Sequence, residues 1–97
     1  MYVKIHKSYR NVVAICDEEL LNKIFEEGER QLDVRENFFK DRKLQKEEIV
    51  RLIKMYSLED STFNIVGENS IEAAREAGLI NKDDAGKIKG IPFILVF

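Results

Sequence analysis

The chain has 97 residues and a mass of 11.3 kDa, enough for one domain and hardly for two. Its 16 Lys and Arg residues against 18 Asp and Glu leave a net charge of −2, which excludes nucleic-acid binding by bulk charge alone. One Cys excludes an internal disulfide framework, and no apolar run approaches the roughly 20 residues of a membrane-spanning helix. The N-terminal segment MYVKIHKSYR lacks the apolar region of a signal peptide, so we expect a cytoplasmic protein without a membrane partner.

The first predicted element is a β-hairpin over residues 2–16. YVKIHK and NVVAIC are rich in β-branched residues, and SYRN between them is typical of a turn. A two-residue loop at Tyr9 and Arg10 would pair Ile5 with Ala14 and Val3 with Cys16. Val3, Ile5, Val12, Ala14 and Cys16 would then share the core face, with His6 on the other face.

The next segments predict a short helix and a short strand. Asp17 suits a helix N-cap, Leu20, Leu21, Ile24 and Phe25 form an apolar stripe, and Gly28 suits the end of that helix. Residues 30–34 alternate in polarity, which predicts a strand.

The second half of the chain predicts two helices and two strands. Apolar residues at helical spacing predict a helix over 46–56, and TFNIV at 62–66 is typical of a strand. Residues 67–78 predict a further helix, residues 81–90 a loop or a short helical turn, and IPFILVF at 91–97 a closing strand. The fold class that follows is α+β: a two-layer sandwich in one domain over 1–97, its sheet mixed or antiparallel, with helices packed on one face and the other face open.

A basic stretch is the first candidate for a functional surface. Residues 40–54 carry six Lys or Arg against three Asp or Glu, and two Phe residues precede them. Cations beside aromatic rings suit RNA, since cations pair with phosphates and rings stack on bases. The candidate phosphate contacts are Lys40, Arg42, Lys43, Lys46 and Arg51, with Phe39 as a stacking ring if it is exposed; the alternative is a solvated surface with both Phe rings in the core.

Two further candidates concern small ligands and catalysis. A strand that runs through Gly67 into a helix exposes N–H groups that can hold an anion, with Asn64 and Glu68 beside them, although the Glu68 carboxylate would repel an anion. Cys16 with His6 as base would make a nucleophilic site, but the two-residue loop places them on opposite faces, and a three-residue loop would reverse that.

The acidic segment and the last strand complete the candidates. Residues 17–29 carry six carboxylates against one Lys, which we interpret as a solvated surface and not a metal site, so we expect no metal and no cofactor. The strand 91–97 is apolar on both faces, so it lies either at the centre of the sheet or against a partner such as a second copy of the chain.

Several segments of the chain resemble a small archaeal family known as domain of unknown function 424. They are MYVKIHKS, VVAICDEELL, FEEG, LDVRENFF, NIVGE, EAAREAGLI and IKGIP, and the most specific are Cys16–Leu20 and Asn64–Glu68. The resemblance implies a cytosolic archaeal protein with a small two-layer α+β fold, and it brings no activity, cofactor or catalytic residue. The chain departs from the family at Lys40 and Asp41, where relatives have a Gly pair, and at Phe93, where relatives often have His.

The sequence therefore predicts a non-enzymatic binding module near RNA or the translation apparatus. The first alternative is a protein-interaction module that forms homodimers through residues 91–97. The second is a small enzyme with a site near Cys16, Asn64 and Glu68. We name no catalytic residue, because no spacing in the chain demands one.

Overall fold

A computed structural model describes residues 1–97, except for the side chain of Lys82. Eight strands and three α-helices follow one another along the chain, with 3-10 turns at Glu18–Leu20 and Lys82–Asp84. The strands are β1 (Tyr2–His6), β2 (Asn11–Cys16), β3 (Ile24–Glu27), β4 (Arg30–Asp33), β5 (Arg42–Lys43), β6 (Ser61–Val66), β7 (Gly86–Ile88) and β8 (Ile91–Val96). The helices are α1 (Glu36–Phe39), α2 (Lys46–Tyr56) and α3 (Glu68–Glu76).

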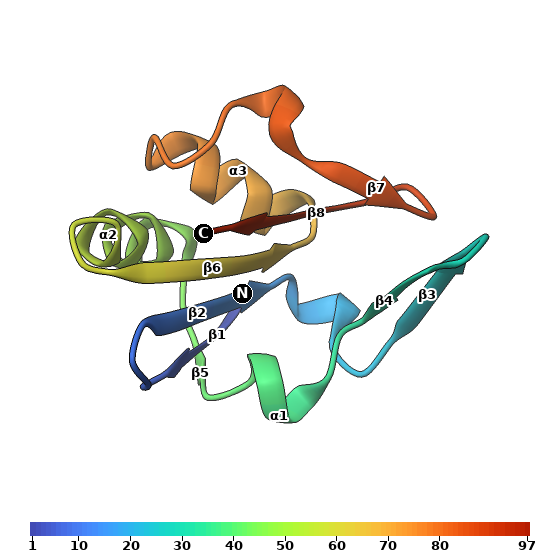
Figure 1. Ribbon diagram of the computed structural model, residues 1–97, viewed down its shortest axis with the longest axis horizontal. Helices are drawn as coiled ribbons and strands as arrows, with labels where there is room; N and C mark the ends of the chain where they lie inside the picture. Colours follow the sequence, from blue (N-terminus) through green and yellow to red (C-terminus); the bar gives the residue numbers. More distant parts are fainter.

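Six of the strands form one mixed sheet in the order β5-β1-β2-β6-β8-β7. Only β2 and β6 run parallel, and the other neighbours are antiparallel. The connection from β2 to β6 contains α1 and α2, as a parallel pair requires a long crossover. β3 and β4 form a separate hairpin that extends from one end of the sheet (Figure 1). The predicted α+β fold with a mixed sheet is confirmed.

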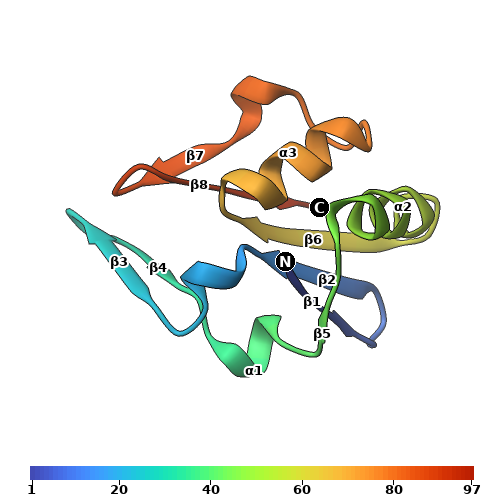
Figure 2. The same cartoon turned by 180° about the vertical axis from the view of Figure 1, so that it is seen from behind.

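The two longer helices cover one face of the sheet, here called the first face. Their apolar stripes bury Ile49 and Ile53 of α2 and Ala73 and Ala74 of α3 against strands β1, β2 and β6. α2 begins and ends where its sequence pattern predicts, and a capping box between Gln45 and Glu48 satisfies its first N–H groups. Helices on one face were predicted, and α2 and α3 confirm it (Figures 1 and 2).

The opposite face, here called the second face, is not open along its whole length. A second small core there joins Ala14 and Cys16 of β2 with Val34 and Phe39, which lie after β4 and in α1. The expectation of an open sheet face is therefore wrong for this half of the sheet, because the 3-10 turn, the β3–β4 hairpin and α1 cover it.

Two β1 side chains on the second face hold α1 in place. Nζ of Lys4 donates to the carbonyl of Asn37 at 2.8 Å, and Nε2 of His6 donates to the carbonyl of Phe38 at 2.8 Å. The His6 ring also stacks on the Phe38 ring, with centroids 4.7 Å apart. These donors satisfy carbonyls that a four-residue helix leaves unpaired.

The register of the β1–β2 hairpin differs from the predicted register by one residue. Val3 faces Ile15 and Ile5 faces Val13, because the chain uses a longer loop between His6 and Asn11 than a two-residue turn. A shift of one residue exchanges the faces of a whole strand. Val13 and Ile15 therefore enter the first-face core, while Ala14 and Cys16 lie on the second face.

The helix predicted to end at Gly28 is wrong. Only Glu18–Leu20 is helical, and Ile24–Glu27 forms β3, which pairs with β4 around a turn at Gly28, whose φ is +64°. The strand predicted at 30–34 is confirmed as β4, and the loop predicted at 81–90 contains the short strand β7.

Candidate functional site

The five cations proposed as an RNA surface do not lie free on one patch. The ion pairs are Lys40–Glu36 at 3.4 Å, Lys43–Glu18 at 2.8 Å and Lys46–Glu76 at 3.2 Å. The hydrogen bond from Lys43 lowers the pKa of Glu18, and the same bond raises the pKa of Lys43. Arg42 and Arg51 are exposed and form no ion pair with another described side chain. RNA binding by these residues stays a prediction, with three of its five cations already beside carboxylates.

The Phe39 ring is not available to stack on a base. Only 4% of Phe39 is exposed, and it packs in the second-face core. Phe38 is half-buried between the His6 ring and the Phe39 ring. The condition on which the sequence made Phe39 a stacking residue is therefore not met, because α1 turns both rings toward the sheet.

The start of α3 already holds an anion, the carboxylate of Asp17. This side chain is 3% exposed and accepts hydrogen bonds from N–H of Asn69 at 3.0 Å, N–H of Ser70 at 2.8 Å and the Ser70 hydroxyl at 2.7 Å. Asp17 thus caps a helix that lies more than 50 residues later in the chain, and not the segment that follows it. The sequence placed an N-cap at Asp17 but assigned it to the wrong helix.

Gly67 is the residue that lets this carboxylate reach the helix. Its φ is +108°, and a Cβ at this position would lie 2.3 Å from Cγ of Asp17. From the sequence, we expected Gly67 to be required by the turn alone. The close contact with Asp17 is a second reason for a glycine at this position. The anion site predicted at the N-terminus of α3 is occupied by the protein itself.

The other two residues of that candidate lie apart from each other. Asn64 is half-buried near the middle of β6, facing Ala14 on one side and Leu95 on the other, and not at the strand end. Glu68 is exposed in the first turn of α3. Neither forms a hydrogen bond that would join them to Cys16 in one site.

Cys16 and His6 share the second face but do not meet. The register pairs Cys16 with Tyr2 and His6 with Val12, so four strand positions separate them, about 13 Å at roughly 3.3 Å per residue. The prediction of opposite faces is wrong, because the longer loop shifts the register. A nucleophilic Cys16 with His6 as its base is still not formed, since His6 lies too far from the thiol to accept its proton.

Cys16 is buried with no exposed surface, and burial together with the Asp17 carboxylate raises its pKa from 9.0 to about 12. We expect native protein to resist iodoacetamide near pH 8 and urea-unfolded protein to react fully, as measured by intact mass.

Because the folded Cys16 thiol holds its proton more tightly than the unfolded one, its contribution to stability is complete below pH 9 and is lost as the pH rises to about 12. The difference in unfolding free energy between wild type and Cys16→Ala should therefore shrink over that range. Rapid alkylation of native protein would contradict this environment and would favour the enzyme alternative.

The acidic segment does not converge on one point. Glu18 pairs with Lys43, while Glu27 in the hairpin accepts a hydrogen bond from N–H of Lys89 at 2.9 Å. Among the described side chains, no group of three or more His, Cys, Asp or Glu is arranged to hold a metal ion.

A cavity of about 610 Å³ lies between the base of the β3–β4 hairpin and α1. Its lining mixes both charges, including Asp33, Arg35 and Lys40, and Nε of Arg35 donates to the Asp33 carboxylate at 2.7 Å. Sequence reasoning missed this cavity, because it assigned Asn22 and Ile24 to a helix. Both cations of the lining are paired with carboxylates, Arg35 with Asp33 and Lys40 with Glu36, so neither is free to select an anionic ligand.

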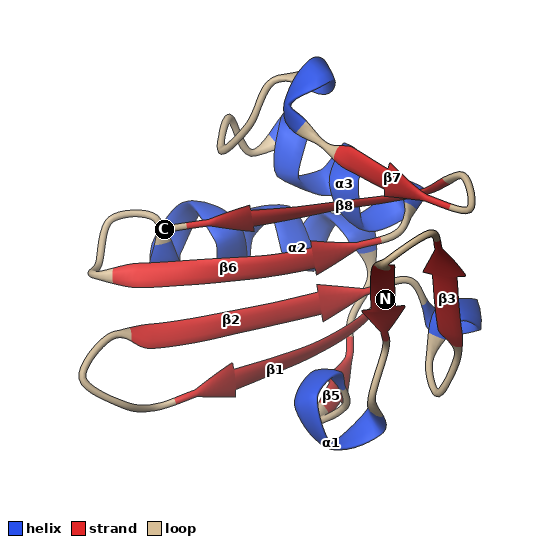
Figure 3. Ribbon diagram, turned by 45° about the vertical axis from the view of Figure 1, so that its right-hand side comes forward, coloured by secondary structure: helices blue, strands red, loops and turns tan.

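The remaining half of the second face is uncovered, and we call it the half-sheet surface. Its residues are Val12, Thr62, Asn64, Leu95 and Phe97. Leu95 is 53% and Phe97 84% exposed. Figure 3 turns this face to the viewer, and neither α1 nor the hairpin lies in front of the left-hand ends of β6 and β8. Neighbouring exposed apolar side chains indicate a contact surface, whereas a single exposed apolar residue is common on any protein.

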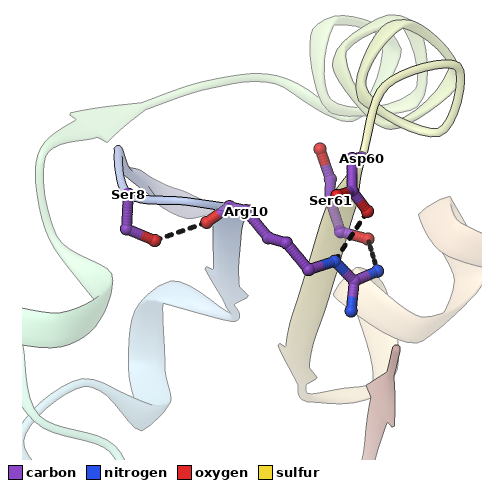
Figure 4. A network of polar contacts seen from close by, with 4 residues as sticks. All are labelled: Ser8, Arg10, Asp60 and Ser61. Carbon is purple, nitrogen blue, oxygen red and sulfur yellow. Dashed lines mark hydrogen bonds and ion pairs between the residues drawn. The ribbon is translucent and has the colours of Figure 1, made fainter.

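An ion pair fixes the loops that border this end of the sheet. Arg10 donates to Asp60 at 2.6 Å and to the carbonyl of Ser61 at 3.5 Å, while the Ser8 hydroxyl donates to the Arg10 carbonyl at 2.5 Å (Figure 4). The β1–β2 loop is thereby tied to the first residue of β6. These contacts hold the loops at the border of the half-sheet surface in place.

In the part of the chain that the structure describes, the helices lack the length and apolar character of a membrane-spanning segment.

Comparisons with known proteins identify a family and a fold. A family model described as "Protein of unknown function (DUF424)" matches residues 6–97. Among solved structures, the chain is similar to the crystal structure of an uncharacterized conserved protein from Methanopyrus kandleri, with a TM-score of 0.88 and 24% identity over 98% of this chain and 88% of that one. At this identity the similarity concerns the fold. No curated protein matches the chain.

Proposed function

Because the chain belongs to the DUF424 family, as its sequence segments predict, and the family description names no activity, we propose a function from the chain's own surface. The protein is a non-enzymatic binding module that takes up a polypeptide partner on the half-sheet surface. The observation that carries this proposal is the exposure of Leu95 and Phe97 beside a part of β8 that no other strand pairs on its outer side.

The arrangement of the candidate catalytic groups supports a binding role over an enzyme. A nucleophile needs a lowered pKa or a base within reach, and Cys16 has a raised pKa while His6 lies four strand positions away. Asp17, the most buried carboxylate, uses its oxygens on the α3 backbone and the Ser70 hydroxyl. A binding role therefore explains the exposed Leu95 and Phe97, and it requires no catalytic step from the buried Cys16 or Asp17.

RNA is the second candidate, and Arg42 and Arg51 are the cations that favour it. They lie exposed without an ion pair to another described side chain, so they remain available to phosphates. The polypeptide partner is preferred because burial of the exposed Leu95 and Phe97 is favourable, whereas only two of the five proposed cations have no carboxylate partner among the described side chains.

A photoreactive amino acid tests the proposed surface. We expect the photo-crosslinker at position 95 to couple to a polypeptide in cells, whereas the same group at Met55, which is equally exposed at 53%, does not. Met55 lies on α2, in the layer over the first face, so it controls for exposure alone. Equal coupling at both positions, or at neither, would reject the half-sheet surface as the binding site.

A further inference from the structure

The outer edge of β8 is paired along only half of its length. β7 pairs with residues Ile91, Pro92 and Phe93, and β6 pairs with 93–96 on the inner side. Figure 3 shows β7 beside only the first part of the β8 arrow, and no strand on the outer side of the part that leads to the C-terminus. An unpaired strand edge is a template for another strand.

The hydrogen-bond pattern shows which backbone groups point outward on this edge. N–H of Gly67 donates to the carbonyl of Pro92 at 2.8 Å, and bonded positions alternate along an antiparallel pair, so Ile94 and Val96 face β6. Leu95 and Phe97 must then direct their N–H and C=O groups away from β6. Outside the strand ladders, no backbone hydrogen bond between described residues involves either one.

We propose that the partner is a second copy of this chain, joined through antiparallel pairing of the two β8 edges into one continuous sheet. This inference rests on the proposed function and names the occupant of that surface. A two-fold axis requires the same edge on both copies, and β8 offers a self-complementary one.

Two constraints select a single register. Backbone groups that point outward must face outward groups of the second copy, and Phe93 already pairs with Gly86, so Leu95 can lie opposite Leu95 or opposite Phe97. The first choice would place Phe97 of the second copy beside Phe93, where Gly86 of β7 already pairs. The register is therefore Leu95 opposite Phe97 in both directions, with the axis at Val96.

The side chains in this register are complementary. On the second face, each exposed Leu95 covers a Phe97 of the second copy, an aliphatic–aromatic pair of the kind that stabilises sheets. Residues 91–97 carry no charged side chain, and the net charge of −2 opposes association only weakly. The contact is shorter than a standard interface, so we expect micromolar affinity.

A cysteine at the axis tests the register. Position 96 faces itself in a non-hydrogen-bonded pair, where Cα atoms lie about 4.5 Å apart, within the range of a disulfide. We expect Val96→Cys to form a disulfide-linked dimer with diamide as oxidant, and Leu58→Cys, which is more exposed, to remain monomeric. Cys16 is buried and does not compete.

Sedimentation velocity of the purified chain, from about 1 μM to about 500 μM, measures the affinity without an added thiol. We expect a monomer–dimer equilibrium that Leu95→Glu weakens at least about tenfold, since two carboxylates enter the apolar contact. A mass that stays monomeric at every concentration, with no disulfide at position 96, overturns the second copy as partner. If position 95 still couples to a different polypeptide in cells, the proposed function survives that failure; if it couples to none, both fail.

Discussion

Asp17→Ala is expected to lower the free energy of unfolding by about 3 kcal/mol, measured by urea denaturation monitored by circular dichroism. The carboxylate is almost fully buried and accepts three hydrogen bonds from Asn69 and Ser70 at the start of α3. Alanine would leave these donors without partners, and each buried donor without an acceptor costs about 1–3 kcal/mol. The same change removes a negative charge from the positive end of the helix.

Glu19→Ala is the matched control for this prediction. Glu19 is a neighbouring exposed carboxylate with no hydrogen bond to another described residue. Its replacement should change stability by less than about 0.5 kcal/mol. Equal effects of the two substitutions would mean that Asp17 acts only through the local charge, and not as a cap.

Gly67→Ala is expected to cost still more, about 4 kcal/mol or loss of the folded state. Its φ of +108° with ψ of 154° lies in a region that residues with a Cβ rarely adopt. The new Cβ would also lie 2.3 Å from Cγ of Asp17, a distance that requires the carboxylate to leave its three donors. Backbone strain and loss of the cap therefore add together.

Gly78→Ala separates these two causes. Gly78 also has a positive φ, +80°, but no atom lies within 4 Å of its added Cβ. It should cost only the backbone strain, about 1–2 kcal/mol. In an Asp17→Ala background, Gly67→Ala should cost at least about 1 kcal/mol less than in wild type, because the clashing atoms are gone. Additive effects would contradict a direct contact between Gly67 and Asp17.

The sequence predicted best the elements whose own residues decide their structure. α2 has an apolar stripe and acidic residues in its first turn, and α3 lies between two Gly residues, so both helices were predicted within about two residues. β6 and β8 were predicted at TFNIV and IPFILVF, within one residue of their observed bounds. Local signals sufficed because each of these elements has a single strong pattern.

The errors arose where distant contacts decide the structure. The stripe from Leu20 to Phe25 suited a helix, but Phe25 and Leu32 instead pack as a hairpin onto the second-face core. Asp17 carried a correct cap signal whose helix lies elsewhere in the chain. For the half-sheet surface, the sequence predicted only an apolar strand at 91–97. The exposure of this surface depends on the short length of β7 and on the position of the β3–β4 hairpin, which local patterns do not determine.

Hydrogen exchange at β8 tests most directly whether its outer edge receives a partner strand. The amides of Ile94 and Val96 face β6 and serve as internal controls, since their protection should not depend on protein concentration. The amides of Leu95 and Phe97 should exchange fast in dilute protein and slow down as the concentration rises through the micromolar range. Exchange at these two amides that is equally fast at every concentration, and unchanged by Leu95→Glu, would contradict pairing of this edge with a second copy.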